Sequence, residues 1–281
     1  MMRAIDFRLR PPFRSYLNNS VMYDYDALKK SHKMRDIGAV STAAMEKDMA
    51  LLIQEMDEAG IIYGVAPVRV PTDGDNDDAV RLMEAYPGRF LGIPWIDPLH
   101  TEDALAQIDK YVTCGPCKGI IMEPAIKTTP EKWFIDDERV FPVYEKCQQE
   151  KIPVLMSFGG RLADPIYYDP RLMYNVAQVF PDLTLVACHG GWPRVTEMCY
   201  VAAECANVYI SADSWMMSFA PGAEDYVTAA NYILQDKIVF GTSYPAMRLP
   251  LAVEDYVKRL RPEVVDKIMY LNGAKIFGLE A

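Results

Sequence analysis

Two arginines placed one residue apart follow the first apolar segment of the chain, in the stretch "IDFRLR". On a β-strand, residues i and i+2 point to the same side, so Arg8 and Arg10 share one face. Guanidinium groups bind carboxylates through paired hydrogen bonds and stay charged at neutral pH. The spacing therefore predicts an anion clamp, made of Arg8 and Arg10, at the end of this strand.

One histidine and two acids follow other apolar segments in the same way. His189 lies in "VACHGGWP", and Glu123 and Asp213 end the stretches "KGIIME" and "NVYISAD". An imidazole with an ordinary pKa of about 6.5 suits proton transfer near neutral pH, so we predict that His189 is a general acid or base. Glu123 or Asp213 would orient it or act as the partner base. The structural alternative is a buried, satisfied histidine, with arginines that only neutralise the nearby acids.

Further hydroxyl and indole groups end the apolar segments and complete the candidate site. The hydroxyls are suited to donate hydrogen bonds to an oxyanion, and the indoles to form an apolar wall for a planar ring. Some of them, Tyr244 and Trp192 above all, are equally suited to plain packing. These predicted substrate-binding residues are Ser157, Ser243 and Tyr244, together with Trp95, Trp192 and Trp215.

Eight apolar segments alternate with helical stretches, which is typical of a parallel sheet buried on both faces. Eight such units in 281 residues predict an α/β fold, a single-domain (β/α)8 barrel spanning residues 1–281, whose strand ends converge on one mouth. An open doubly wound sheet is the alternative, but no Gly-x-Gly-x-x-Gly pattern follows the first strand. The predicted strands lie within 3–7, 60–68, 89–97, 118–124, 151–160, 182–191, 207–215 and 236–245.

The predicted helices lie between these strands and after the last one. The segment at 43–59 has Thr42 as candidate N-cap and Gly60 as candidate C′ residue. The first connection, at about 11–41, is long enough to be a lid or an interface element. The other predicted helices are at about 75–86, 102–113, 137–150, 170–179, 193–204, 223–235, 251–259 and 263–277.

Composition excludes several classes of partner. The formal net charge is −10, so non-specific nucleic-acid binding lacks the basic footprint that it needs. No apolar run approaches the roughly 20 residues that span a bilayer, and charges interrupt the N-terminal segment. We therefore expect a cytoplasmic protein without membrane partners. The six cysteines are expected to be thiols, and the pair Cys114 and Cys117 is expected to form a helix-to-strand turn rather than a redox site.

Four stretches carry a resemblance to a known family: "VACHGGWP", "VFGTSYP", "YLNGAKIFGL" and "DERVFPVYEKCQQEKIPVLM". They resemble the amidohydrolase-related enzymes of the aminocarboxymuconate-semialdehyde decarboxylase type, over nearly the whole chain. The resemblance implies a (β/α)8 barrel with hydrolase, decarboxylase or hydratase activity on small carboxylic acids. It also implies a divalent metal and a homodimer or higher homo-oligomer.

The chain departs from that family at the metal ligands. The family has His-x-His after the first strand, a histidine after the fifth and an aspartate after the eighth. This sequence has Arg8 and Arg10, Ser157 and Ser243 at those positions, and of the family's histidines it keeps His189. A guanidinium has no lone pair to offer a metal, whereas a zinc site needs three or four ligands. We therefore predict an enzyme without a metal cofactor.

Three functions remain open at this point. The first is metal-independent hydrolysis, hydration or decarboxylation of a small anionic substrate, such as a lactone, a β-keto acid or a hydroxylated aromatic acid. The second is a Zn²⁺- or Mn²⁺-dependent hydrolase or decarboxylase that uses Glu123, His189 and Asp213. The third is a non-catalytic protein that binds a small anion. A homo-oligomer is expected in each case, with tyrosines of the long first connection as interface anchors: Tyr16, Tyr23 and Tyr25.

Overall fold

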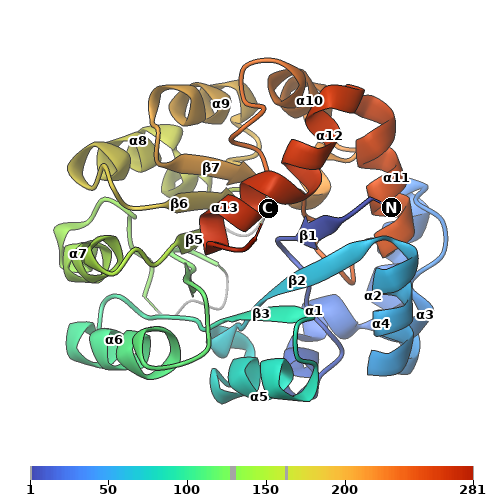
Figure 1. The fold of residues 1–281 in the computed structure, drawn as a ribbon, viewed down its shortest axis with the longest axis horizontal. Coiled ribbons are helices and arrows are strands. Elements are labelled where there is room, and N and C mark those ends of the chain that lie inside the picture. The colour runs from blue at the N-terminus through green and yellow to red at the C-terminus, as the bar shows by residue number, and fades with distance from the viewer. Residues whose placement is uncertain (1, 127–130, 162–163, 281) are drawn as a thin grey trace.

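Parallel strands surround the centre of the molecule (Figure 1). The computed structural model describes residues 2–126, 131–161 and 164–280. Within these ranges the strands form two parallel sheets, of order β1-β2-β3 and β4-β5-β6-β7. Their bounds are β1 (Ala4–Asp6), β2 (Ile61–Pro67), β3 (Phe90–Ile93), β4 (Ile120–Met122), β5 (Val154–Ser157), β6 (Leu185–Cys188) and β7 (Val208–Ser211).

Single parallel bridges join the two sheets into a closed ring. One bridge lies between the ends of β3 and β4, and two more connect residues 238–244 to β7 and to the residues after β1. Residues 238–244 thus occupy the eighth position, and the predicted (β/α)8 barrel is confirmed. The bridged pairs are Trp95 with Ile121, Ile210 with Ile238, and Leu9 with Tyr244.

The eighth segment is not the regular strand that the sequence predicts for 236–245. The Asp6 carboxylate accepts hydrogen bonds from the Thr242 backbone N–H at 2.9 Å and from the Thr242 hydroxyl at 2.5 Å. A side chain of β1 therefore takes the place of a backbone partner for the eighth segment. Ser243, with a φ of +57°, then turns the chain out of the extended conformation.

Helix α13 (Asn272–Phe277) lies across one end of the barrel (Figure 1). Alternate strand residues such as Ile5, Val65 and Leu155 fill the interior and form one buried cluster with Phe277. Phe7 stacks on Phe277 with the ring centroids 5.2 Å apart. The barrel interior is therefore packed at this end, where the strands begin, and the polar residues that follow the strands lie at the opposite end.

The outer helices bury a second cluster against the strands. The predicted helix at 43–59 is two helices, because Asp48 caps the second one by accepting hydrogen bonds from two backbone N–H groups. Ser41, not Thr42, is the N-cap of the first. Gly60 has a φ of +69°, as predicted for a C′ residue. The helices are α3 (Thr42–Glu46), α4 (Met49–Glu58), α5 (Asp77–Ala85), α6 (Thr101–Ile108), α7 (Phe141–Gln149), α8 (Pro170–Val179), α9 (Val195–Glu204), α10 (Ala223–Asn231), α11 (Leu249–Arg259) and α12 (Pro262–Asp266).

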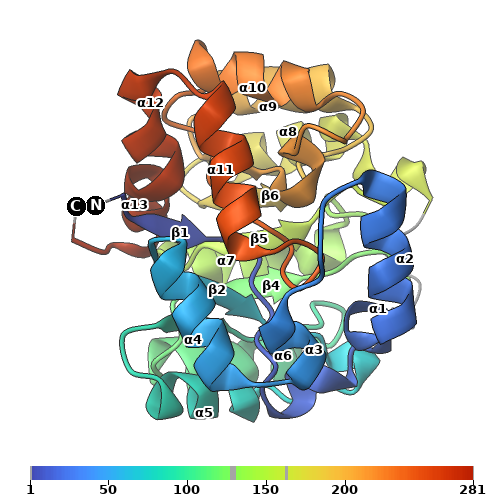
Figure 2. The same ribbon diagram turned by 90° about the vertical axis from the view of Figure 1, so that its right-hand side faces the viewer.

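The long first connection is itself helical. It contains α1 (Ser20–Tyr23) and α2 (Tyr25–Arg35). Figure 2 shows α2 at the end of the molecule opposite to α13 and to both termini. This position places α1 and α2 beside the mouth at which the strands end, as expected of a lid.

Two tyrosines predicted as interface anchors instead hold this lid to the barrel. Tyr16 and Tyr23 donate hydrogen bonds to the backbone carbonyls of Ala66 and Arg10, at 3.0 and 2.7 Å. Their hydroxyls face strand ends; the Tyr16 side chain is buried, whereas the Tyr23 side chain is half-buried. Tyr25 remains 40% exposed. The homo-oligomer stays a prediction from the sequence.

Two further features concern the cysteines and the helices. All six cysteines are free thiols, and Cys114 and Cys117 lie in the turn before β4. In the described part of the chain, no helix combines the length and the apolar character that crossing a bilayer requires.

Candidate active site

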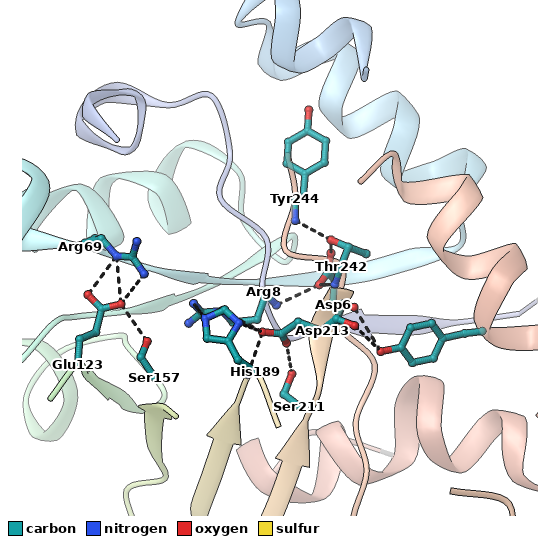
Figure 3. Close-up of polar contacts among 12 residues, drawn as sticks. Asp6, Arg8, Arg69, Glu123, Ser157, His189, Ser211, Asp213, Thr242 and Tyr244 are labelled. Carbon is teal, nitrogen blue, oxygen red and sulfur yellow. Dashed lines mark hydrogen bonds and ion pairs between the residues drawn. The ribbon is translucent and has the colours of Figure 1, made fainter. Parts of the chain in front are cut away.

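Three residues from different strand ends meet at the mouth of the barrel: Arg8 after β1, His189 after β6 and Asp213 after β7 (Figure 3). Arg8 Nη2 lies 3.0 Å from His189 Nε2, and Arg8 Nε lies 3.4 Å from Asp213 Oδ2. His189 Nδ1 lies 3.2 Å from the same carboxylate oxygen. Arg8 and Asp213 are fully buried and His189 is 8% exposed. The three side chains therefore form one connected, buried cluster.

The contacts assign the protonation state of His189. Arginine can only donate, so Nε2 must accept from Arg8 and the ring proton must be on Nδ1, on the side of the Asp213 carboxylate. The His189 backbone N–H donates a hydrogen bond to the same carboxylate, at 3.3 Å. Burial, followed by the charges of Arg8 and Arg10, holds the pKa of His189 well below its ordinary value. His189 is therefore neutral, with its lone pair on Nε2.

Asp213 is held in place by its surroundings. Its Oδ1 accepts a hydrogen bond of 2.5 Å from Ser211, and its backbone carbonyl accepts one of 3.1 Å from Tyr256. Burial raises the pKa of Asp213 to about 6, against the opposing charge of Arg8. A Cβ at Gly241 would lie 2.6 Å from Asp213 Oδ1, so the carboxylate needs a glycine beside it. Asp213 is thus tightly positioned yet able to titrate near neutral pH.

Backbone conformation also marks this mouth. His189, Asp213 and Ser243 have φ values of +67°, +56° and +57°. This left-handed region is rarely adopted by residues other than glycine, and such strain concentrates at functional sites. In each case it turns the chain sharply at or shortly after a strand end.

A second arginine–carboxylate pair lies across the mouth. Arg69 binds Glu123 through both carboxylate oxygens, with Nη2 to Oε1 at 2.7 Å and Nε to Oε2 at 3.1 Å. Ser157 donates to Oε1 at 2.9 Å. Burial alone would raise the pKa of Glu123, but the Arg69 guanidinium holds it below its ordinary value. Glu123 is therefore an ionised carboxylate that fixes Arg69.

Arg10 lies beside both pairs but joins neither. It is 3% exposed, and its Nε and Nη2 atoms have no hydrogen-bond partner among the described residues. It borders a cavity of about 320 Å³ that opens at the mouth of the barrel. The cavity is lined by Arg8, Arg10, Met22, Arg35, Arg69, Gly160, Arg161, His189, Ser214, Trp215, Ser243 and Ala246.

Several residues predicted for the site lie outside this cavity. Tyr244 is fully buried, with its hydroxyl 3.0 Å from Ser41 Oγ, and Trp192 donates its indole N–H to the Pro221 carbonyl. Trp95 and Ser157 do not line the cavity either. Trp192 stacks on Trp215 with ring centroids 3.9 Å apart, so only the inner ring of this pair reaches the cavity.

The sequence interpretation missed three arginines that line the cavity. Arg69 follows β2, a strand to which no site residue was assigned, although its place two residues beyond the strand matches the pattern used for the others. Arg35 comes from α2, and Arg161 follows the two glycines after β5. No pattern in the sequence places a residue of the first connection at the mouth.

The residues at the mouth do not fit a divalent metal. Among the described residues, no group of three or more His, Cys, Asp and Glu side chains could hold a metal ion. The Nε2 lone pair of His189 and one oxygen of Asp213 both face Arg8, and Glu123 faces Arg69. The donor atoms that a metal would need thus already contact two guanidinium groups. The alternative metal site of Glu123, His189 and Asp213 is therefore not assembled.

Comparison with known proteins identifies the family of this (β/α)8 barrel. The amidohydrolase family model matches residues 48–279. The chain belongs to the amidohydrolase family, as the sequence motifs predicted, and hence to a family of enzymes. The search of curated proteins returned no match.

Solved structures extend this likeness to the whole chain. An uncharacterized TIM-barrel protein from Bordetella bronchiseptica is 31% identical, with a TM-score of 0.90 and coverage of 99% of each chain. A 2,6-dihydroxybenzoate decarboxylase from Rhizobium is 16% identical, with a TM-score of 0.72 and 99% coverage of each chain. A dihydroxybenzoic acid decarboxylase from Polaromonas with bound manganese is 15% identical, with a TM-score of 0.67 and coverage of 99% of this chain and 97% of the other. The last two similarities support the fold.

Proposed function

We propose that this chain hydrolyses a small carboxylate-containing compound such as a lactone, without a metal cofactor. The observation that carries the proposal is a neutral His189, oriented by Asp213, at the edge of a cavity lined by arginines. Hydration, or decarboxylation of a β-keto acid or hydroxylated aromatic acid, would use the same groups. The family and the decarboxylases of similar fold support this range of reactions.

Arg10 is the proposed primary anion site. Its buried guanidinium has two nitrogen atoms without partners, and a carboxylate accepts two parallel hydrogen bonds in that geometry. Arg8 contributes through Nη1, which is also without a partner in the described structure. Burial of these charges is costly unless a ligand neutralises them. We expect the substrate carboxylate to supply that neutralisation.

His189 is the proposed general base. When the Arg8 guanidinium turns toward a substrate carboxylate, its Nη2 leaves His189 Nε2, and this nitrogen can take a proton from water. The hydroxide adds to the acyl carbon, the ring oxygen leaves, and His189 returns the proton to it. Because the charges of Arg8 and Arg10 depress the pKa of His189, a bound anion raises its basicity when it is needed.

Other residues take positioning roles in this proposal. Glu123, which the sequence suggests as catalytic, is an ionised partner of Arg69 and no proton donor. Ser243 lines the cavity, and its hydroxyl has no partner in the described residues, so it can donate to the developing oxyanion. Trp215 supplies an apolar wall for a flat ring.

The proposal is tested by a panel of lactones, β-keto acids and hydroxylated aromatic acids, with turnover and binding both measured. We expect turnover of at least one class, and weaker binding of its acid to the Arg10→Gln variant. Arg171→Gln, which changes an exposed arginine of α8, is the matched control and should bind like the parent protein. Binding without turnover of any class would favour the non-catalytic anion-binding alternative.

A further inference from the structure

Among the residues that the structure describes, arginines outnumber the acids around the cavity. The floor holds Arg8, Arg10 and Arg69, which are buried or nearly so, and the rim holds Arg35 and Arg161, which are more exposed. The acids that face the floor arginines are Asp6, Glu123 and Asp213. With all three acids ionised, five cations against three anions leave two positive charges. A ligand with one carboxylate would neutralise only half of this excess.

The arginines that have no carboxylate partner lie in two places. In the floor, Glu123 binds Arg69 and Asp213 pairs with Arg8, which leaves Arg10 without a carboxylate partner. At the rim, Arg35 and Arg161 form no ion pair with a carboxylate in the described ranges. Burial and then the charge of Arg161 lower the pKa of Arg35, so the two rim arginines lie close enough to repel each other.

The two clusters come from different parts of the fold. Arg10 follows β1 at the floor, whereas Arg35 is the last residue of α2 and Arg161 follows β5. The Arg35 guanidinium packs 5.1 Å from the centre of the Phe219 ring, which directs it without neutralising it. Trp215 lines the same cavity, so a flat, apolar spacer between two charges fits the lining.

We propose that the cavity binds a small dicarboxylate, with one carboxylate on Arg10 in the floor and the other between Arg35 and Arg161 at the rim. The inference rests on the proposed function, because Arg10 is the anion site in both. The new element is that the second carboxylate contacts Arg35, which belongs to the lid helix α2. Arg35 and Arg161 then determine specificity for diacids over monoacids.

Calorimetric titration with three probes at one ionic strength tests the inference: benzoate, isophthalate and inorganic phosphate. Isophthalate carries two separated carboxylates on a flat ring, benzoate carries one, and phosphate carries a similar charge on a compact ion. We expect isophthalate to bind at least about tenfold more tightly than benzoate, since it gains a second charge-assisted contact. Phosphate should bind less tightly than isophthalate, because a compact ion does not carry two separated carboxylates, and equal binding of the two would overturn the inference.

The variants Arg35→Gln and Arg161→Gln sharpen the test, with Arg171→Gln as the control outside the cavity. Each rim variant should weaken isophthalate binding toward that of benzoate and leave benzoate unchanged. Equal binding of both acids to the parent protein, or equal weakening of both acids by Arg35→Gln, would overturn the inference alone. An equal loss of isophthalate affinity in Arg171→Gln would mean that the loss comes from the change in net charge, and it would also overturn the inference. If neither acid binds, the proposed anion site at Arg10, and with it the proposed function, is wrong.

The two rim variants guard against a folding artefact. Arg161 is exposed, so Arg161→Gln should melt at the temperature of the parent protein. If Arg35→Gln disturbs α2, the Arg161→Gln result alone decides the question. An unchanged isophthalate affinity in a folded Arg161→Gln variant would contradict the rim site.

Discussion

Two arginine–carboxylate pairs face each other across the barrel mouth, and they differ in every respect that matters for chemistry. Arg69 and Glu123 form a bidentate pair with a shortest contact of 2.7 Å, and the pKa of Glu123 is lowered. Arg8 and Asp213 are 3.4 Å apart, share His189, and the pKa of Asp213 is raised to about 6. We call Arg69 and Glu123 the closed pair, because both carboxylate oxygens bind the guanidinium, and Arg8 and Asp213 the open pair. The closed pair positions its neighbours, whereas the open pair contains an acid that can titrate and so can move protons.

The first and largest expected effect concerns the histidine of the open pair. His189→Gln keeps a polar side chain but removes the proton-accepting nitrogen. We expect turnover of the substrate found in the panel to fall about 10²- to 10⁴-fold, the range for loss of a general base. Steady-state kinetics measure the effect.

Ser157→Ala is the matched control in the closed pair. It removes one hydrogen bond to Glu123 and leaves the bidentate contact with Arg69. Its turnover should stay within a few-fold of the parent. A variant Ser157→Ala that loses as much activity as His189→Gln would erase the distinction between the two pairs.

The second prediction breaks the closed pair. Glu123→Gln leaves the Arg69 guanidinium, whose side chain is 12% exposed, without its carboxylate. Removing one partner of a buried ion pair costs about 3–5 kcal/mol of unfolding free energy. Urea denaturation followed by circular dichroism measures it. Asp213→Asn should cost less, because burial favours the uncharged form of this carboxyl group. A larger loss of stability in Asp213→Asn than in Glu123→Gln would contradict this.

The third prediction uses pH to test the open pair. The pKa of Asp213 is about 6 in the folded protein, whereas its ordinary value is 3.8. Between pH 3.8 and about 6, the folded state therefore binds more protons than the unfolded state. The contribution of Asp213 to stability is therefore present at pH 4 and is lost as the pH rises to about 6. The difference is on the order of 3 kcal/mol for a shift of roughly two units.

Unfolding free energies at pH 4, 5, 6 and 7 check this prediction. The stability of the parent protein relative to Asp213→Asn should fall across that range, while the similar contribution of Asp6 cancels because both proteins retain it. A difference that grows with pH would mean that Asp213 is stabilised as an anion, like Glu123.

The smallest expected effect lies outside both pairs. Tyr244→Phe removes a hydroxyl that contacts Ser41 and does not reach the cavity. We expect a loss of about 1 kcal/mol in stability, the worth of one buried hydrogen bond, and turnover within about twofold of the parent. A large loss of turnover with unchanged stability would return Tyr244 to the active site.

The sequence predicted the barrel and most of its helices, and it placed several polar residues at strand ends that meet at one mouth. It did so because apolar segments bury on both faces and end in polar residues, as at Arg8, His189 and Asp213. The contacts of Asp6 cannot be predicted from such patterns. Its contacts with Thr242 depend on the packing of the first segment against the last, and they interrupt the eighth strand.

The same limit explains the sorting of the predicted site residues. Trp215 and Trp192 both follow strands, but which indole faces the cavity depends on how the two rings stack. Arg35 reaches the rim only because α2 folds back over the barrel mouth, a tertiary arrangement that no local spacing encodes. Arg69, by contrast, was available to the strand-end argument and was overlooked.

The central claim is that arginines, not a metal, organise the chemistry of this amidohydrolase barrel. The most direct test is the turnover rate of chelator-dialysed protein, measured with its metal content and again after addition of Mn²⁺ or Zn²⁺. The account predicts an unchanged rate at far less than one metal ion per chain. A rate that vanishes on dialysis and returns in proportion to bound metal would contradict it.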